Sequence, residues 1–268
     1  MITTAFLIKQ VATANDKPIL FACSDGKEYW VKDQQGGRKR RALIDEWIGA
    51  SLAREMSIPV PDWEAIQLIP ESYEPSIIQP KGRKLTHGVC FGSNNIQNMI
   101  DFSDQTINLK SKRIFDQVTN PEDFIRIAIF DLWVANGDRN ANNYNLIMKR
   151  QPEELTFYAI DHSFMFEDHE FSKISLELNS FQDDTGSLLG TNANKYLLKK
   201  IGLKKARDVG TAFFESISLI SEVTLRGMFQ NVPEAWQFSH QEQNWVVEFL
   251  LTRRNGLYTE LKTRNIVR

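Results

Sequence analysis

One strongly polar loop, between two segments that the sequence marks as buried, constrains this chain more than any other feature. The loop ANGDRNANNYNLI covers residues 135–147 and carries five Asn, one Asp and one Arg. It follows DFIRIAIFDLWV (123–134), which is apolar nearly all round and therefore typical of a buried helix. After it come two runs with strand character, 144–149 and 155–160, joined by RQPEE. The chain must therefore fix a cluster of polar side chains between a buried helix and a β-hairpin.

The hairpin is expected to bring together two polar residues that lie far apart in the sequence. Asn143 stands just before its first strand and Asp161 just after its second, and the outer ends of two antiparallel strands lie side by side. Asp138 belongs to the same loop, five residues before Asn143. We therefore expect two carboxylates and one amide to converge at one end of the hairpin.

This set of side chains fits phosphoryl transfer. Mg²⁺ prefers oxygen ligands, and a protein commonly supplies one or two of them beside phosphate oxygens and water. Asn143 and Asp161 provide such oxygens, which leaves Asp138 to orient a substrate hydroxyl and accept its proton. Protein kinases arrange a catalytic Asp, an Asn five residues later and a metal-binding Asp after a short hairpin in this way.

Two other interpretations of the loop stay open. Asp138, Asn140 and Asn142 could begin a calcium loop of the EF-hand kind, but that loop needs Gly and Glu where this chain has Asn143 and Lys149. The loop could also be a purely structural turn, because Asn and Asp side chains readily bond to loop backbone groups. The Asp that follows the hairpin favours the kinase interpretation over both.

A kinase also needs a cation for the nucleotide phosphates, held by a carboxylate. Lys32 ends a predicted strand, and Glu46 lies in the predicted helix 42–56 that follows. We take Lys32 and Glu46 as the expected pair, with the adjacent Asp45 as the alternative partner. The competing interpretation is an exposed Lys at a strand end and an unrelated Glu.

The N-terminal part is predicted to be a small antiparallel sheet with one helix. Asp25-Gly26 is a strong hairpin signal, and Asn15-Asp16 is a second, weaker one. The predicted strands are 5–12, 17–23, 28–32 and 63–69.

The remainder is predicted to be mainly helical. Residues 70–115 suggest a connection followed by a structured loop, which includes HGVCFGS (87–93). The helix before the polar loop is predicted for 121–134, with Asn120 as its cap and Gly137 as its left-handed C-terminal residue. Later helices are predicted for 192–201, 204–220, 221–229 and 240–254, the last with a capping box of Ser239 and Glu242.

Composition argues against several classes of protein. The net charge of −2 and a pI near 6.1 give no global basic field for nucleic acid. No apolar run is long enough to span a bilayer, and MITTAFLIKQ lacks the basic start of a signal peptide. Cys23 and Cys90 form no metal or redox motif and are typical of reduced thiols. We therefore expect a cytoplasmic protein that binds neither nucleic acid nor membrane.

Three segments carry a resemblance to the HipA-like kinases, with a more distant likeness to phosphatidylinositol kinases. FDLWVANGDRNANNYNLI followed by AIDHSF resembles their catalytic and metal-binding region, which has Asp-Arg in place of His-Arg-Asp. YWVKD with LIDEWIGASLAREMSIPVPD is similar to their Lys strand and Glu helix, and PEAWQF to the end of the compact HipA-like domains. The likeness touches most of the chain and is most specific at residues 131–163.

On this basis we predict a two-lobed, protein-kinase-like fold of the α+β class. A small N-lobe, an antiparallel sheet with one helix, is expected over residues 1–78, and a mainly helical C-lobe over 79–268. ATP with Mg²⁺, or with Mn²⁺, is expected between them. HipA-like kinases phosphorylate protein Ser or Thr, and several are toxins of bacterial toxin–antitoxin modules. The resemblance therefore implies a protein substrate and an antitoxin-like partner.

The resemblance also implies a role for each site residue. Asp138 is implied as the catalytic residue. Lys32, with Glu46 as its partner, is implied for binding the nucleotide cofactor, and Asn143 and Asp161 for binding the metal.

The chain departs from the resembled family at three points. The turn TANDKP (13–18) has no glycine with which to hold phosphates closely, Asn140 stands where relatives commonly have His, and the chain is shorter than the HipA toxins. A small-molecule or lipid kinase with the same site therefore stays an alternative, as does a pseudokinase that serves as a nucleotide-binding interaction module.

Overall fold

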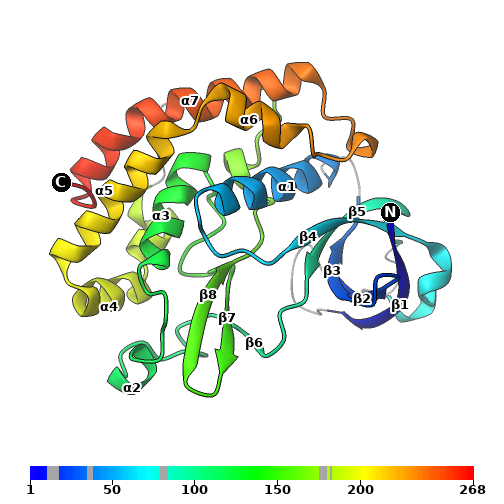
Figure 1. Cartoon of the computed structure of the whole chain (residues 1–268), viewed down its shortest axis with the longest axis horizontal. Coiled ribbons are helices and arrows are strands. Elements are labelled where there is room, and N and C mark those ends of the chain that lie inside the picture. Colours follow the sequence, from blue (N-terminus) through cyan, green and yellow to red (C-terminus); the bar gives the residue numbers. More distant parts are fainter. Residues whose placement is uncertain (11–17, 35–38, 79–83, 175–179, 182) are drawn as a thin grey trace.

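The computed structural model describes residues 1–10, 18–34, 39–78, 84–174, 180–181 and 183–268. Within them the fold is mixed α/β. Five strands form a small closed barrel, three more form a second sheet, and helices make up most of the rest. Figure 1 shows the barrel on one side of the molecule and the C-terminal helices on the other.

The barrel takes its strands in the order β1-β2-β3-β5-β4. Neighbours are antiparallel except β1 and β4, which are parallel. The predicted turn at Asp25-Gly26 is confirmed, since Gly26 has φ +79° and its N–H donates to the carbonyl of Cys23 over 3.0 Å. The other expected turn, at Asn15-Asp16, lies outside the described residues. The strands are β1 (Ile2–Gln10), β2 (Ile19–Cys23), β3 (Glu28–Lys32), β4 (Trp63–Leu68) and β5 (Gly88–Asn94).

Strand β5 is the element of the barrel that the sequence did not predict. It covers most of HGVCFGS (87–93), which was expected to lie in a loop, and it pairs with both β3 and β4. A Cβ atom on Gly92 would lie 2.3 Å from Cγ1 of the buried Ile66 on β4, so only glycine fits there. Glycine lowers strand propensity, which is why the pattern hides this strand. The barrel therefore takes its last strand from beyond residue 78.

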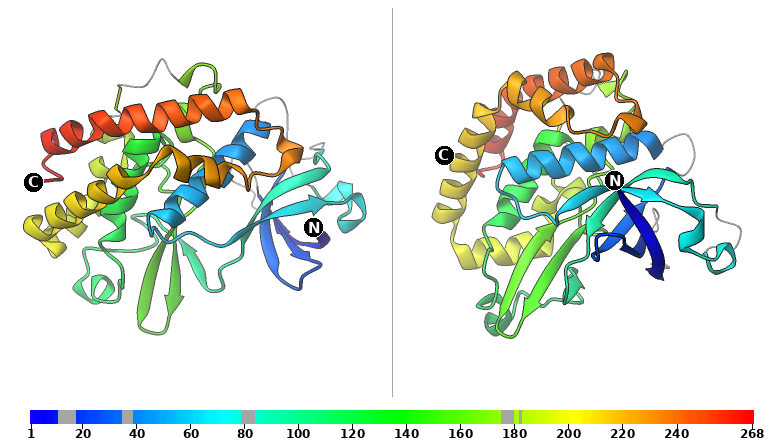
Figure 2. Two further views of the ribbon diagram at one scale, coloured as in Figure 1. Left: turned by 45° about the horizontal axis from the view of Figure 1, so that its top comes forward. Right: turned by 45° about the vertical axis from the view of Figure 1, so that its right-hand side comes forward.

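Helix α1 (Lys39–Glu55) follows the barrel strand β3 in the chain but packs with the C-terminal helices. Its apolar residues, such as Leu43, belong to the core of the helical part and not to the separate core of the barrel. Nη1 of Arg40 donates to the carbonyl of Trp236 over 2.8 Å, and the ring of Trp47 lies 5.6 Å from that of Trp236. Figure 2 shows α1 alongside the C-terminal helices, and α1 packs against β5 as well.

The helical part begins with the second sheet, whose strands are antiparallel in the order β6-β7-β8. These strands are β6 (Met99–Asp101), β7 (Leu146–Gln151) and β8 (Glu154–Ala159). The helices are α2 (Lys112–Phe115), α3 (Asp123–Val134), α4 (Asn192–Ile201), α5 (Leu203–Leu219), α6 (Glu222–Phe229) and α7 (His240–Thr263). Short 3₁₀ turns are η1 (Pro70–Ser72), η2 (Pro75–Ile77), η3 (Met165–Asp168), η5 (Asp184–Gly186), η6 (Leu188–Gly190) and η7 (Glu234–Trp236).

Helix α3 is buried along nearly its whole length, as predicted, but its ends differ from the prediction. Ala135, with φ +54°, takes the left-handed position expected for Gly137. Asn120 stands too far before the first turn to cap it. Its side chain accepts from the N–H of Phe157 over 2.8 Å and donates to the carbonyl of Phe157 over 3.1 Å. Asn120 therefore fixes α3 against strand β8.

Helix α7 begins with the predicted capping box, in which Ser239 and Glu242 bond to each other's backbone N–H groups. It runs past its predicted end because Leu257 and Leu261 are buried in the core beyond that point. At 24 residues α7 has the length of a membrane span. Among the described helices, however, none combines that length with the apolar character that crossing a bilayer requires.

Candidate active site

A cavity of about 450 Å³ lies where the barrel meets the β7–β8 hairpin. It is lined by residues from both parts of the chain, among them Lys32, Glu46, Asn143, Asn145 and Asp161. Four of the five predicted site residues therefore share one cavity. The fifth, Asp138, does not line it but is bonded to two residues that do.

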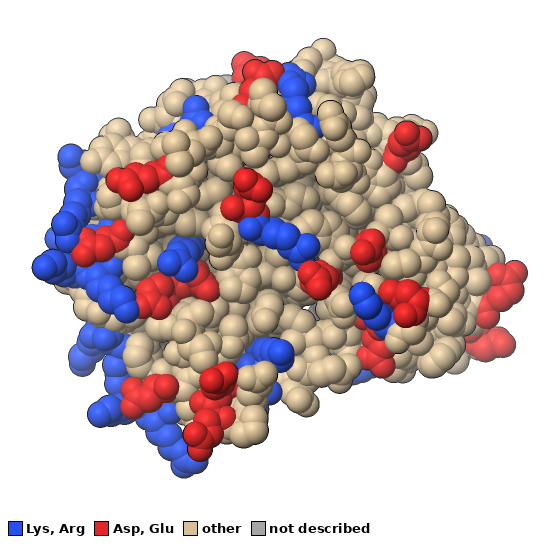
Figure 3. All heavy atoms as spheres, viewed as in Figure 1, with Lys and Arg blue, Asp and Glu red and all other residues tan. Residues whose placement is uncertain are grey.

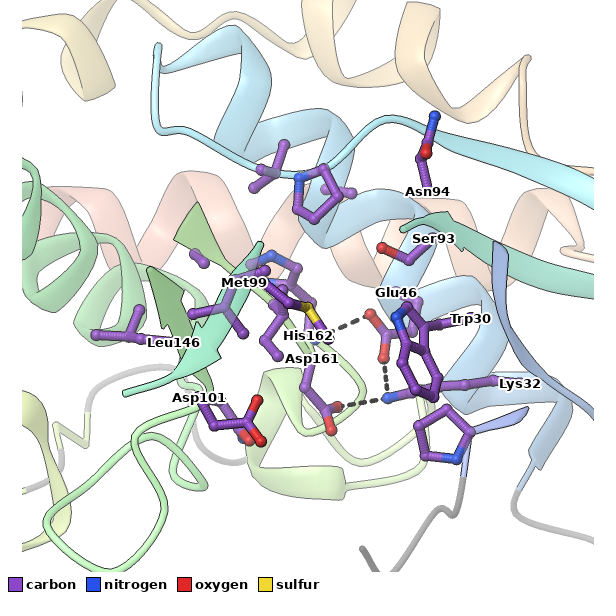
Figure 4. Close-up of a pocket in the computed structure, with 18 of the residues that line it drawn as sticks. Trp30, Lys32, Glu46, Ser93, Asn94, Met99, Asp101, Leu146, Asp161 and His162 are labelled. Carbon is purple, nitrogen blue, oxygen red and sulfur yellow. Dashed lines mark hydrogen bonds and ion pairs between the residues drawn. The ribbon is translucent and has the colours of Figure 1, made fainter. Parts of the chain in front are cut away.

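Lys32, the last residue of β3, joins two carboxylates. Its Nζ lies 2.5 Å from Oε1 of Glu46 in α1 and 2.8 Å from Oδ1 of Asp161 after β8. Figure 4 shows both carboxylates turned toward the Lys32 ammonium. The other oxygen of Glu46 accepts from the N–H of His162 over 3.0 Å. The expected pair therefore forms, and it also links the barrel to the segment after the hairpin.

Asp45, the alternative partner for Lys32, lies elsewhere. It is fully buried, and its Oδ2 accepts from Nε of Arg41 over 3.1 Å. Arg41 also donates to the carbonyl of Met165 over 3.3 Å. Burial raises the pKa of Asp45 to about 8, although the cation of Arg41 lowers it. Asp45 thus serves the attachment of α1, and Glu46 serves the cavity.

The two carboxylates around Lys32 hold their charge differently. Burial raises the pKa of Glu46 to about 7, although the Lys32 cation opposes the rise. Burial also disfavours the charge on Asp161, but the Lys32 cation and hydrogen bonds from Lys32 and Ser163 outweigh it and hold the pKa of Asp161 below its usual range. A proton taken up by this cluster therefore goes to Glu46, and Asp161 keeps the charge that a metal ligand needs.

Asp138 is held by two amides of its own loop. Its Oδ2 accepts from Nδ2 of Asn143 over 2.7 Å and from Nδ2 of Asn145 over 3.0 Å. Burial raises the pKa of Asp138, the hydrogen bond from Asn145 lowers it, and the charge of Asp161 adds to the rise. Both amides bond to Oδ2, so the other carboxylate oxygen, Oδ1, takes no part in these two bonds.

Asn145 lies at the boundary of the hairpin. The predicted strand included this residue, but it precedes β7 and has φ +45°, a conformation that Asn tolerates better than most residues.

The ends of the hairpin meet directly in front of the cavity. The N–H of Ile160 donates to the carbonyl of Asn145 over 3.1 Å, which closes the two strands beyond their regular pairing. Asp161 follows with φ +59°, a left-handed conformation that is costly for a residue with a side chain. Such strain gathers at functional sites, where the surrounding structure holds it in place.

Arg139 attaches the polar loop to helix α3 and to the end of the hairpin. It is fully buried, forms an ion pair with the equally buried Asp131 of α3, and donates to the carbonyl of Ile160 over 2.7 Å. Nδ2 of Asn136 also donates to Asp131, over 3.3 Å. Burial raises the pKa of Asp131 to about 7 against the pull of Arg139. The sequence did not reveal this pair, although an Asp in the last turns of an otherwise apolar helix was the available signal.

His162 lines the cavity with part of its surface and packs its ring in the core. It is 2% exposed, and its ring lies edge-on to that of Phe130 at 6.0 Å. A Cβ atom on Gly49 of α1 would lie 2.4 Å from Cβ of His162, so glycine lets α1 approach this segment closely. This close approach is what brings Glu46 within reach of the His162 N–H.

The cavity has the groups that a nucleotide with a divalent cation requires. Lys32 is a cation for phosphate oxygens, and Asn143 and Asp161 carry the amide and carboxylate oxygens that Mg²⁺ prefers. Among the described residues no group of three or more His, Cys, Asp or Glu side chains could hold a metal alone. A cation held by Asn143 and Asp161 would take its further ligands from water and phosphate oxygens, which is the usual arrangement for Mg²⁺. The non-glycine turn is undescribed from Thr13 to Lys17.

The comparison with known families gives one match over nearly the whole chain. The model of the family described as HipA-like kinase matches residues 5–265. Among curated proteins, no sequence match was found.

Solved structures of kinases share the fold at low sequence identity. The Helicobacter pylori proinflammatory kinase CtkA superposes with a TM-score of 0.64 at 14% identity, over 98% of this chain and 96% of its own. The Golgi casein kinase superposes with a TM-score of 0.56 at 13% identity, over 99% of this chain and 76% of its own. A structure of the Golgi casein kinase with Mn/ADP bound gives 0.51 at 13% identity, over 99% and 75%. The fold of this chain is thus that of a kinase.

Proposed function

This chain belongs to the HipA-like kinase family, and on that premise we propose that it transfers the γ-phosphoryl group of ATP to a hydroxyl group, with protein Ser or Thr as the acceptor. The observation that carries the proposal is the Lys32 cation, in contact with Glu46 at 2.5 Å and with Asp161 at 2.8 Å. It stands in the same cavity as Asn143, which bonds to Asp138. Phosphoryl transfer depends on such a set of positioned charges more than on covalent chemistry.

We also propose that the molecule has two lobes, which meet at this cavity. The barrel, which extends to Asn94, forms the smaller lobe, so we place the boundary there and not at residue 78. The helical part forms the larger lobe and includes α1, which the chain order would give to the first.

Each site residue has one task in the proposed reaction. Lys32 binds a phosphate oxygen of ATP, and Glu46 holds Lys32 in place. Asp138 orients the acceptor hydroxyl and takes its proton as the new oxygen–phosphorus bond forms and the bond to ADP breaks. Asn143 and Asp161 would hold Mg²⁺ or Mn²⁺, which neutralises phosphate charge when bound. The Mn/ADP complex of the Golgi casein kinase supports that use of nucleotide and metal.

Labelled ATP tests the proposal. The purified protein, incubated with γ-labelled ATP, Mg²⁺ or Mn²⁺ and a cell extract, is expected to transfer label to protein, and acid hydrolysis is expected to release phosphoserine or phosphothreonine. Asp138→Ala and Asp161→Ala are expected to abolish the transfer. Transfer that survives Asp161→Ala would contradict the metal assignment.

Other outcomes would replace the proposed acceptor or the proposed activity. Label in a soluble metabolite or in lipid would indicate a small-molecule or lipid kinase. A thermal shift with ATP and metal, but without any transfer, would indicate a nucleotide-binding pseudokinase. An antitoxin-like partner remains part of the proposal through the family alone, and co-purification with a neighbouring gene product would test it.

A further inference from the structure

A dense group of cations lies on the helical part, outside the cavity. Residues 192–207, NANKYLLKKIGLKKAR, contain six Lys or Arg residues and no carboxylate. They form α4 and the start of α5, and five of the six cations are exposed: Lys195, Lys199, Lys200, Lys204 and Lys205. Figure 3 shows Lys and Arg gathered along the edge of the molecule where Figure 1 places α2, α4 and α5. We call this surface the α4–α5 basic face.

The segment around α2 extends the basic face and places aromatic rings within it. Nζ of Lys110 lies 5.1 Å from the centre of the Tyr196 ring, and Nζ of Lys200 lies 5.5 Å from that of Phe115. These contacts fix the α2 segment against α4. The segment adds three exposed cations to the face: Lys110, Lys112 and Arg113.

The face also contains a hollow of about 360 Å³ between α4, α5 and the C-terminal residues. Lys195, Arg207 and Arg264 line it, and no carboxylate is among the described residues that do, although Arg264 forms an ion pair with Glu260 of α7 over 2.6 Å. Arg207 is oriented by hydrogen bonds to the carbonyl and side-chain oxygens of Asn265, at 3.1 and 3.0 Å. A positively charged hollow within a positively charged face can seat an anionic group.

Helix stability explains only some of these lysines. Lys199 and Lys200 end α4, where cations favour the helix dipole, but Lys204 and Lys205 stand in the first turn of α5, where cations oppose it. Lys205 forms an ion pair with Glu122. Within the described part of the chain, Lys204 has no such partner. An external anion would offset the repulsion that the first turn of α5 carries.

We propose that the α4–α5 basic face binds the phosphate backbone of a nucleic acid. Lysine is depleted at protein–protein interfaces, whereas it binds phosphates well as a point charge. The rings of Tyr196 and Phe115 between the lysines resemble the mixture of cations and aromatic residues on surfaces that bind single strands. This proposal replaces the expectation from net charge, because a total of −2 averages over a strongly uneven distribution.

The same face does not fit a membrane. A helix that lies in a lipid surface buries a broad apolar side. On α4 and the first turn of α5, Leu203 is the one exposed large apolar residue, at 62% exposure. Charge without an apolar side favours a polyphosphate in water over a bilayer.

Binding measurements with matched variants test the proposal. One variant removes three exposed charges from the basic face: Lys195→Gln, Lys199→Gln and Lys204→Gln. The control removes three exposed charges elsewhere: Lys27→Gln, Arg150→Gln and Lys173→Gln. Fluorescence anisotropy compares a short unstructured RNA, a DNA duplex of mixed sequence and labelled polyglutamate, and vesicles that contain phosphatidylserine are tested by sedimentation. The RNA and DNA arms separate the two sources of the backbone.

We expect the affinity for nucleic acid to depend strongly on salt concentration and on the lysines of the basic face. If four phosphates are contacted, wild-type affinity for a duplex falls about 10²-fold between about 50 and 200 mM salt. The face variant is expected to bind at least about 10-fold more weakly, with the slope against log salt reduced by up to about three. The control variant is expected to match the wild type. The wild-type salt slope needs no variant, so a folding defect cannot mask the answer.

Three results would overturn the proposal. They are wild-type binding without salt dependence, equal binding by the face variant and the control, and preference for polyglutamate or vesicles over both nucleic acids. The basic face shares no residue with the lining of the catalytic cavity, so the face variant is expected to keep wild-type turnover of ATP. Failure of this proposal therefore leaves the proposed kinase activity untouched.

Discussion

The carboxylates of the candidate site are held in two different ways. In the Lys32 cluster, Glu46 and Asp161 share one cation at 2.5 and 2.8 Å. In the polar loop, Asp138 accepts hydrogen bonds from the neutral amides of Asn143 and Asn145. A buried ion pair that loses one member leaves an uncompensated charge, whereas the partly exposed Asp138 can replace a lost amide with water. Stability and catalysis are therefore expected to separate between the Lys32 cluster and the polar loop.

The largest expected effect on kcat is in the polar loop. Asp138→Asn keeps the shape of the side chain and an oxygen that can accept both amide bonds, but it removes the proton acceptor. We expect kcat to fall about 10²–10⁴-fold, with the free energy of unfolding within about 1 kcal/mol of wild type. Phosphoryl transfer assays and urea unfolding measure the two quantities. Asp116→Asn, at an exposed site, is the control. An unchanged kcat in Asp138→Asn would show that Asp138 is not the proton acceptor.

The Lys32 cluster is expected to show the opposite balance. Lys32→Met leaves Glu46, which is 2% exposed, without its cation, and we expect unfolding to cost about 3 kcal/mol less. Adding Glu46→Leu is expected to restore most of the stability but none of the phosphoryl transfer. Urea unfolding with Lys27→Met as the exposed control measures this. A Lys32→Met variant as stable as the wild type would show that the ion pair of Lys32 with Glu46 contributes nothing to stability.

A smaller effect tests the role of Asn145. Asn145→Ala removes one amide from Asp138, and we expect about a 10-fold loss of kcat, the scale of one hydrogen bond to a charged group. Because that bond lowers the pKa of Asp138, the acid limb of the pH–rate profile is expected to move to higher pH. Asn142→Ala, on the exposed part of the loop, is the control. A lower rate with an unmoved acid limb would mean that Asn145 acts on something other than Asp138.

The smallest expected effect is in the pH dependence of stability. Glu46 has its pKa raised from 4.5 to about 7, so the folded protein binds a proton that the unfolded chain releases in that range. Its contribution to stability is complete below pH 4.5 and is lost as the pH rises to about 7. Glu46→Gln is expected to reduce this fall but not abolish it, since Asp131 and Asp45 also have raised pKa values. Equal slopes in wild type, Glu46→Gln and the exposed control Glu55→Gln would contradict the assignment.

The features that could be predicted from the sequence are those that depend on residues close together in the chain. The convergence of Asp138, Asn143 and Asp161 could be predicted because a hairpin brings its own two ends together, and Lys32 could be proposed because it ends a strand. Glu46 and Asp45 are adjacent in one helix, so they point in different directions from it. The structure brings Glu46 to Lys32 and Asp45 to Arg41.

The rest depends on contacts that no local pattern contains. The N–H of His162 reaches Glu46 across 116 positions of the chain, and the need for Gly92 appears only when Ile66 packs over it. Arg139 was noted as a family feature, but its buried partner Asp131 is visible only once α3 and the loop are placed together. Such residues read as breaks in a pattern until the neighbour that requires them is known.

The attachment of α1 shows that a residue outside the cavity can set the cavity's geometry. Nη1 of Arg40 in α1 donates to the carbonyl of Trp236 over 2.8 Å, and Nε1 of Trp236 donates to the carbonyl of Val89 in β5 over 2.8 Å. Trp236 therefore binds both the helix that carries Glu46 and the strand that pairs with the end of β3 at Lys32. The 2.5 Å contact of Lys32 with Glu46 thus depends on a tryptophan near the other end of the chain, which is not among the described residues that line the cavity.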